Sequence, residues 1–175
     1  NPSGSSNIKL SFPNLCLETQ ASLFLKYNAE NYISAIALIA GQISLDEFEI
    51  IRSNSIKLPQ GRGEILKLRE GNILIDFAHD HQSIQNILSE LANYHDEIIL
   101  VFGCGGDRDK SKRSKMMKIA QDFASKIFFT SDNNRYEPFS SIVKDGKTFS
   151  TCGTYATPSL TILCVGVLVF SIPFI

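Results

Sequence analysis

A run of apolar residues that leads into a glycine-rich loop is the feature that most constrains the fold of this chain. Residues 98–102 are all isoleucine, leucine, valine or phenylalanine, so a buried strand is predicted over 97–102. Residues 103–109 follow with three glycines, two aspartates and Arg108, and a helix is predicted over 115–124. A strand, a tight turn and a helix in this order favour an α/β sheet, in which ligands bind beyond the carboxyl ends of the strands.

The glycine loop does not by itself define a ligand. Its spacing fits neither a dinucleotide-binding fingerprint nor a Walker A loop, which needs Gly-Lys-Ser/Thr. The same glycines also suit a purely structural turn, in which they supply positive φ angles. Both interpretations stay open from the loop alone.

The segments around this loop alternate as an α/β sheet requires. A hairpin is predicted from 64–69 and 72–77, a helix over 82–94 and a further strand over 126–130. Strands and helices in alternation predict a Rossmann-like, doubly wound and mostly parallel sheet with right-handed crossovers.

A stretch rich in proline and glycine marks a domain boundary near Leu58. Region 1–58 is predicted to hold a short strand within 8–17, broken at Pro13, and two helices, the second opened by a capping box of Ser44 and Glu47. We therefore expect 1–58 and 59–145 to be separate domains.

Residues 146–175 are expected to be an apolar tail, since the sequence has no charged residue after Lys147. Residues 160–175 come close to the length of about 18 to 20 that a membrane helix needs, but they lack basic flanks. The tail is open to three interpretations: a buried strand, a weak membrane anchor, or residues unrelated to the domain before it. We favour a mis-joined end over an anchor, because so apolar a tail would leave a large exposed patch unless it were buried.

Composition narrows the classes of partner. The chain has 17 basic and 18 acidic residues and a formal net charge of −1, so it has no general attraction to nucleic acid or to an anionic membrane. None of its four cysteines forms a Cys-x-x-Cys pair, so a zinc site is not expected. Because no signal peptide is recognised at the start of the sequence, a disulfide framework is not expected either. Cys104, beside the glycines, is a minor candidate for a nucleophile.

Polar side chains follow three successive strands of the predicted sheet. The three clusters are Asp76 with His79, Asp107 with Arg108, and Asp132 and Asn133 with Arg135. In a parallel sheet they converge on one edge, although charged runs are also common on solvated surfaces. The arginines suit bidentate recognition of carboxylate or phosphate. Asp132 and Arg135 would hold the two ends of an amino acid, and Asp76 would accept from a ribose hydroxyl or help to bind a metal.

Four motifs resemble those of the carboxy-terminal domain of the Mur ligase family. They lie at 61–64 (Gly-Arg-Gly-Glu), 75–79 (Ile-Asp-Phe-Ala-His), 101–113 (from Val-Phe-Gly-Cys-Gly-Gly to Lys-Arg) and 130–135 (Thr-Ser-Asp-Asn-Asn-Arg). The resemblance covers about residues 26–138. It is greatest to the members that add meso-diaminopimelate to UDP-N-acetylmuramoyl-L-alanyl-D-glutamate (UDP-MurNAc-L-Ala-D-Glu) in peptidoglycan synthesis.

The resemblance implies an ATP-dependent acid–amino-acid ligase that works through an acyl phosphate. It implies ATP and Mg²⁺ as cofactors and a cytoplasmic location. It implies no nucleic-acid partner, and no membrane partner unless the tail at 160–175 is an anchor.

The resemblance also assigns roles to two groups of residues. Diaminopimelate would be bound by Arg108, Asp132, Asn133, Asn134 and Arg135. The nucleotide would be bound by Asn28, Asn31, Arg62, Asp76 and His79, with Arg62 reaching the γ-phosphate or the acyl phosphate. No catalytic or metal-binding residue is assigned.

Arg135, the last residue of the motif at 130–135, has a physical rationale. Diaminopimelate carries a distal carboxylate that lysine lacks, and Arg135 would give that carboxylate a charged partner. The family loop usually reads Asp-Asn-Pro-Arg, whereas Asn134 stands here in place of the proline. Without the fixed φ of proline we expect this loop to be less rigid.

Three departures from the family limit the implied function. The sequence contains no Gly-x-x-x-x-Gly-Lys-Ser/Thr loop to hold ATP phosphates. The family's UDP-binding domain and most of its central domain are not found, so 1–58 is expected to be a remnant of the central ATP-binding domain. After about Pro138 the sequence stops resembling the family. We therefore expect a fragment that is inactive alone, and we keep two alternatives open: a non-catalytic binding module of the same fold, or a membrane-tethered fragment.

Overall fold

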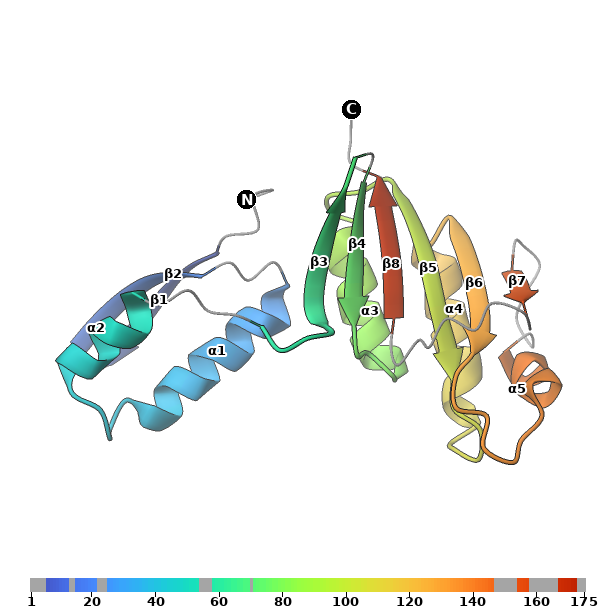
Figure 1. The fold of residues 1–175 in the computed structure, drawn as a ribbon, viewed down its shortest axis with the longest axis horizontal. Helices are drawn as coiled ribbons and strands as arrows, with labels where there is room; N and C mark the ends of the chain where they lie inside the picture. The colour runs from blue at the N-terminus through green and yellow to red at the C-terminus, as the bar shows by residue number, and fades with distance from the viewer. Residues whose placement is uncertain are drawn as a thin grey trace. The chain divides into compact units, whose positions relative to one another are not determined.

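The computed structural model describes residues 6–12, 15–21, 25–53, 58–69, 71–146, 154–157 and 167–172. The chain divides into two units, Asn1–Pro59 and Gln60–Ile175, both of which are drawn in Figure 1. The division falls one residue after the boundary expected near Leu58.

The first unit combines a hairpin with two helices. Strands β1 (Ser6–Phe12) and β2 (Leu15–Ala21) pair antiparallel, and helices α1 (Lys26–Ile39) and α2 (Leu45–Ser53) follow. Ile8, Ile36 and Phe48 form a small buried core that joins β1 to both helices. The strand expected within 8–17 is therefore a hairpin, and the break expected at Pro13 lies outside the described residues.

The capping box predicted for α2 is confirmed. The backbone N–H of Ser44 donates to Glu47 Oε2 at 2.8 Å, and the backbone N–H of Glu47 donates to Ser44 Oγ at 3.2 Å. These reciprocal bonds satisfy donors that a helix start otherwise leaves without partners.

The second unit is an α/β domain built on a six-stranded mixed sheet. The strands stand in the order β3-β4-β8-β5-β6-β7. Their bounds are β3 Arg62–Leu68, β4 Gly71–Asp76, β5 Glu97–Cys104, β6 Lys126–Ser131, β7 Thr154–Thr157 and β8 Val167–Ile172. The helices between them are α3 His81–Leu91, α4 Ser111–Phe123 and α5 Phe139–Gly146.

Part of the apolar tail, residues 167–172, forms strand β8 of this sheet. It lies between β4 and β5 and pairs antiparallel with both. Residues 167–172 thus form a strand inside the sheet, which agrees with the strand interpretation of the tail, while the origin of 146–175 stays an expectation. No helix among the described residues is long and apolar enough to cross a membrane.

The Rossmann-like α/β fold is confirmed, and most of its strands share one direction. Strands β5, β6 and β7 pair in parallel, and β4 runs the same way as β5 because both are antiparallel to β8. Strand β8 stands between β4 and β5. As Figure 1 shows, the arrowheads of β4, β5 and β6 point the same way, so their carboxyl ends meet at one edge of the sheet.

The core lies between the sheet and helices α3 and α4, which lie side by side on one face (Figure 1). Helix α3 buries apolar residues that stand three and four positions apart, and β5 contributes a nearly continuous buried run, as a central strand requires. The buried residues are Ile84, Ile87, Leu88 and Leu91 of α3, and Ile98, Leu100, Val101 and Phe102 of β5.

Helix α4 begins at Ser111, four residues earlier than predicted. Asp109 Oδ1 accepts from both the backbone N–H and the hydroxyl of Ser111, at 2.9 and 2.7 Å, and so supports an early start. The prediction at Lys115 was wrong because the lysine-rich first turn hides the apolar periodicity.

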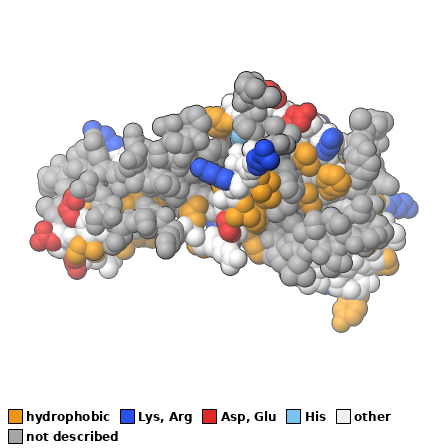
Figure 2. All heavy atoms as spheres, turned by 45° about the horizontal axis from the view of Figure 1, so that its top comes forward, with side chains coloured by type: hydrophobic (Ala, Val, Ile, Leu, Met, Phe, Trp, Pro, Cys, Tyr) orange, Lys and Arg blue, Asp and Glu red, His pale blue; other side chains and the backbone are white. Residues whose placement is uncertain are grey.

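Strand β3 is an edge strand of the described sheet and exposes large apolar side chains. Ile65, Leu66 and Leu68 are 38%, 44% and 53% exposed. Figure 2 shows hydrophobic side chains beside basic ones on the visible surface.

Candidate ligand pocket at the carboxyl edge of the sheet

A cavity of about 580 Å³ lies where the three strand ends meet. The loop after β4, the glycine loop after β5 with the start of α4, and the loop after β6 all contribute to its wall. The lining residues are Phe77, His79, Gly103, Cys104, Gly105, Arg108, Asp109, Lys112, Arg113, Met116, Asp132, Asn133 and Arg135. Five of the predicted site residues therefore share one pocket: His79, Arg108, Asp132, Asn133 and Arg135.

The glycine loop is shaped by its close contact with the loop after β6. A Cβ atom added to Gly106 would lie 1.9 Å from the backbone oxygen of Asn134, so no other residue fits there without moving the backbone. The N–H of Gly106 donates to the carbonyl of Asn133 at 2.8 Å. The loop thus needs its glycine for close approach, and it presents Arg108 at the pocket.

The loop after β6 is held by hydrogen bonds at the position where the family has proline. The hydroxyl of Ser131 donates to Asn134 Oδ1 at 3.1 Å, and the N–H of Glu137 donates to the Asn134 carbonyl at 2.9 Å. The N–H of Arg135 donates to Asn133 Oδ1 at 3.2 Å. Asn134 itself does not line the pocket, so it shapes the loop rather than the wall of the cavity.

The pocket wall has more cationic than acidic side chains. Arg108, Lys112, Arg113 and Arg135 face two acids, Asp109 and Asp132. Arg108 and Arg135 are exposed, whereas Asp132 is half-buried. Such a wall suits an anion with more than one negative group, and Asp132 offers an acceptor for an ammonium group.

A buried ion cluster lies behind the pocket. Arg113 is 1% exposed and donates to both carboxylate oxygens of Glu137, at 2.8 and 2.6 Å, and to Asp145 Oδ2 at 2.7 Å. Lys110 Nζ lies 3.3 Å from Glu137 Oε1. The hydrogen bonds from Arg113 lower the pKa of Glu137 to about 2, and Glu137 in turn raises the pKa of Arg113. The pair is therefore charged at neutral pH.

The predicted nucleotide residues of the second unit lie around the end of β4. Asp76 is buried, and its Oδ1 accepts from the N–H of Ala78 at 2.9 Å. The Arg62 guanidinium lies 4.8 Å from the centre of the Phe77 ring, which packs edge-on against His79. Of these predicted residues only His79 lines the cavity, while Arg62 and Asp76 lie outside its wall.

Asn28 and Asn31 belong to the first unit. Both lie on α1, where Asn28 is buried and Asn31 is exposed. The structure therefore divides the predicted nucleotide residues between the two units.

Two other sequence hypotheses can be weighed against the geometry. Burial raises the pKa of the Cys104 thiol to about 12, and its Sγ lies 3.8 Å from Met116 Sδ, so the thiol is protonated at neutral pH and is a poor nucleophile. Within the described residues, no three His, Cys, Asp or Glu side chains gather to hold a metal.

Sequence reasoning missed Arg113 and Glu137 as parts of the site. Once α4 is known to begin at Ser111, Arg113 falls on the same helix face as Met116, Met117 and Ala120, all of them buried. That spacing was available in the sequence. The pairing with Glu137, 24 residues away, was not.

The fold and the pocket define a Rossmann-like α/β domain with a cation-rich cavity at the carboxyl edge of its sheet. The family model described as "Mur ligase, glutamate ligase domain" matches residues 61–161. The chain belongs to the Mur ligase family.

Two curated relatives carry the name UDP-N-acetylmuramoyl-L-alanyl-D-glutamate--2,6-diaminopimelate ligase. The relative from Fusobacterium nucleatum subsp. nucleatum is 35% identical over 144 residues, which cover 80% of this chain and 30% of the relative. The relative from Listeria monocytogenes serotype 4b is 36% identical over 121 residues, which cover 68% of this chain and 25% of the relative. This chain thus spans less than a third of the length of either relative.

Solved structures agree with the family. A structure named UDP-N-acetylmuramoyl-L-alanyl-D-glutamate--2,6-diaminopimelate ligase matches with a TM-score of 0.54 and 29% identity, over 86% of this chain and 32% of that chain. Folylpolyglutamate synthase from Thermotoga maritima matches with a TM-score of 0.59 and 17% identity, over 90% of this chain and 40% of that chain. The second likeness shows the fold alone.

Proposed function

We propose that this chain is the amino-acid-binding part of an ATP-dependent ligase that adds meso-diaminopimelate to UDP-MurNAc-L-Ala-D-Glu. The observation that carries the proposal is that Arg108, Asp132 and Arg135 line one cavity. The names of the curated relatives support the substrate.

The wall of the pocket matches the charges of the amino acid. Diaminopimelate has two carboxylates and two ammonium groups. Arg108 and Arg135 each supply a planar donor that can pair with one carboxylate, and the carboxylate of Asp132 can accept from an ammonium group. L-Lysine lacks the distal carboxylate, so its binding would leave one guanidinium without a partner. Asn133 adds an amide to the same wall.

The work of this chain in the reaction is then to hold and orient the amine that attacks the activated D-glutamate carboxylate. Orientation of this kind removes much of the entropic barrier to bond formation. ATP and Mg²⁺ are the family's cofactors, but the sequence has no complete Gly-x-x-x-x-Gly-Lys-Ser/Thr loop. We assign no phosphate-transfer step to these residues.

The nucleotide roles form a second part of the proposal. In the second unit Arg62, Asp76 and His79 gather at the end of β4, where Asp76 would accept from a ribose hydroxyl and Arg62 would pair with a phosphate. In the first unit Asn28 and Asn31 would contact the adenine.

Isothermal titration calorimetry with meso-diaminopimelate and L-lysine tests the substrate. We expect the chain to bind meso-diaminopimelate more tightly than L-lysine. Arg108→Ala or Arg135→Ala should weaken the binding of meso-diaminopimelate by about tenfold to a hundredfold, because each removes one hydrogen-bonded ion pair with the ligand. Arg135→Ala should also reduce the ratio by which the chain prefers meso-diaminopimelate to L-lysine.

Tyr136→Ala is the matched control for this titration, because the Tyr136 side chain is 98% exposed and does not line the pocket. It should bind both amino acids as the unmodified chain does. Equal affinity for both ligands, unchanged by Arg135→Ala, would refute the proposed substrate.

A further inference from the structure

The buried pair of Arg113 and Glu137 touches the glycine loop directly. Glu137 Oε2 accepts from the backbone N–H of Asp107 at 3.0 Å, in addition to its bond from Arg113. Arg113 Nη2 also donates to the carbonyl of Gly105 at 3.1 Å. The pair therefore holds the backbone on both sides of Gly106, immediately before Arg108.

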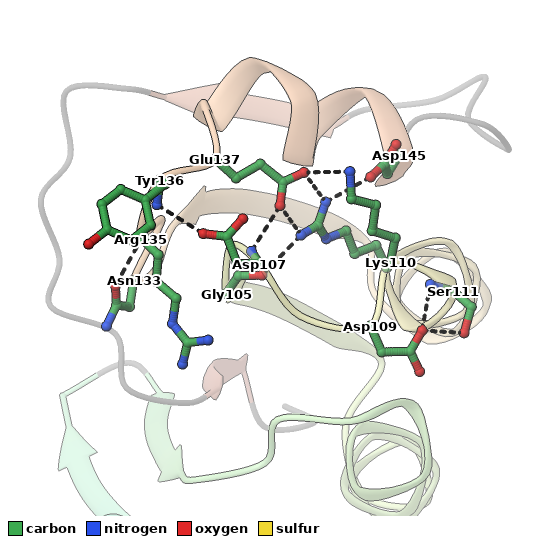
Figure 3. Close-up of polar contacts among 11 residues, drawn as sticks. Gly105, Asp107, Asp109, Lys110, Ser111, Asn133, Arg135, Tyr136, Glu137 and Asp145 are labelled. Atoms are coloured by element: carbon green, nitrogen blue, oxygen red, sulfur yellow. Dashed lines mark hydrogen bonds and ion pairs between the residues drawn. The ribbon is translucent and has the colours of Figure 1, made fainter.

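The glycine loop is tied in turn to the loop that carries Arg135. The N–H of Tyr136 donates to Asp107 Oδ2 at 3.0 Å, and the N–H of Gly106 donates to the carbonyl of Asn133. Figure 3 shows Glu137, Lys110 and Asp145 gathered at one point, with Asp107 between Glu137 and Tyr136 and the Arg135 side chain directed away from Glu137.

Both loops adopt backbone conformations that need support. Asp107 and Arg135 have φ angles of 50° and 49°, in the left-handed region that non-glycine residues rarely occupy. Such conformations persist when surrounding contacts fix them. The contacts that fix these two residues include the hydrogen bonds that Glu137 and Asp107 accept.

We infer that Glu137 and Arg113 are positioning residues, which clamp the loops at 105–107 and 133–137 together and thereby set the separation and direction of Arg108 and Arg135. This inference rests on the proposed function, because the separation of two arginines selects an amino acid with two carboxylates. A fixed spacing favours diaminopimelate over an amino acid with a single carboxylate, for which spacing has little effect.

The charges of the clamp suit a positioning role better than a direct contact with ligand. Both oxygens of Glu137 are occupied by Arg113, Lys110 and the Asp107 N–H. The charge of Arg113 is balanced by Glu137 and Asp145. The lowered pKa of Glu137 keeps this arrangement ionised throughout the neutral range.

Amide hydrogen exchange on the full chain tests whether the clamp holds the loop. Glu137→Gln replaces one carboxylate oxygen by an NH₂ donor, and Glu137→Ala removes both acceptors. We expect exchange at Asp107 to accelerate by at least about tenfold in Glu137→Gln and further in Glu137→Ala, with the central amides of β5 unchanged. If the alanine variant does not fold, the glutamine variant carries the test.

Asp145→Asn is the matched control, because Asp145 bonds the same arginine but makes no bond to either loop among the contacts described. It should leave exchange at Asp107 unchanged. Unaltered Asp107 exchange in Glu137→Gln, or the same acceleration in Asp145→Asn, would overturn the clamp.

A ligand measurement separates positioning from mere stability. In Glu137→Gln we expect the Kd for meso-diaminopimelate to rise by at least about tenfold. The Kd for L-lysine should rise less, so the preference for meso-diaminopimelate over L-lysine should fall. An equal change for both amino acids, or no change for either, would contradict a positioning role. If the unmodified chain bound no meso-diaminopimelate, the proposed substrate would fail, and the exchange measurement would still decide the clamp.

Discussion

Asp107 and Arg135 show how single residues hold the pocket in a costly conformation. Both are non-glycine residues at positive φ, and each precedes or carries an arginine of the pocket. The side chain of Asp107 compensates for part of this cost, because it accepts the Tyr136 N–H. Asparagine tolerates the same backbone region and keeps an acceptor, whereas alanine does neither.

Asp107→Ala should therefore lower the free energy of unfolding of the second unit by roughly 1 to 2 kcal/mol, from backbone strain and a lost hydrogen bond. Asp107→Asn should lower it by less than about 0.5 kcal/mol. Urea denaturation of both variants checks the difference. Equal losses in the two variants would show that the Asp107 side chain does not support the loop.

Helix α3 is stabilised by a capping box at its N-terminus, formed by Asp80 and Ser83. Asp80 Oδ1 accepts from the N–H of Ser83 at 2.8 Å, and the N–H of Asp80 donates to the Ser83 hydroxyl at 3.3 Å. The bond from the Ser83 N–H lowers the pKa of Asp80 below its ordinary value of 3.8. A carboxyl group whose folded pKa is lowered stabilises the fold above its unfolded pKa and loses that contribution as the pH falls through the folded value.

Asp80→Ala should cost about 1 kcal/mol of unfolding free energy at neutral pH. The difference from the unmodified chain should shrink as the pH falls below 3.8. Asp80→Asn, which keeps an acceptor without a titrating group, is the control. Urea denaturation across this range makes the comparison, and a difference that stayed constant or widened in acid would contradict the cap.

Elements defined by local patterns were predictable, and elements defined by distant partners were not. The buried face of α3 and the capping box of Ser44 depend on residues three or four apart, which a sequence displays directly. The place of β8 depends on pairing with β4 and β5, about 70 to 100 residues away along the chain. Likewise, the strand ends located the pocket, but nothing local to Glu137 indicates Arg113 as its partner.

At the scale of the molecule, the second unit depends on a strand from the far end of the chain. Strand β8 closes the gap between β4 and β5, which would otherwise expose two unpaired edges in the middle of the sheet. Unpaired backbone groups at such a position are costly. The strand also holds β4 and β5, whose ends supply His79 and the glycine loop.

A chain that ends after residue 166 should therefore lose the cooperative unfolding transition of the second unit. A chain that ends after Ile172 retains β8 and serves as the control. Thermal unfolding followed by circular dichroism compares the two. A cooperative transition at an unchanged temperature without β8 would mean that the strand contributes nothing to the domain.

A crystal structure of this chain with meso-diaminopimelate tests most directly whether the three strand ends form a receptor for a dicarboxylic amino acid. We predict that the ligand lies in the cavity, with one carboxylate at hydrogen-bonding distance from Arg108, the other from Arg135, and an ammonium group beside Asp132. A ligand bound elsewhere, or bound in the cavity with neither guanidinium in contact, would contradict the account.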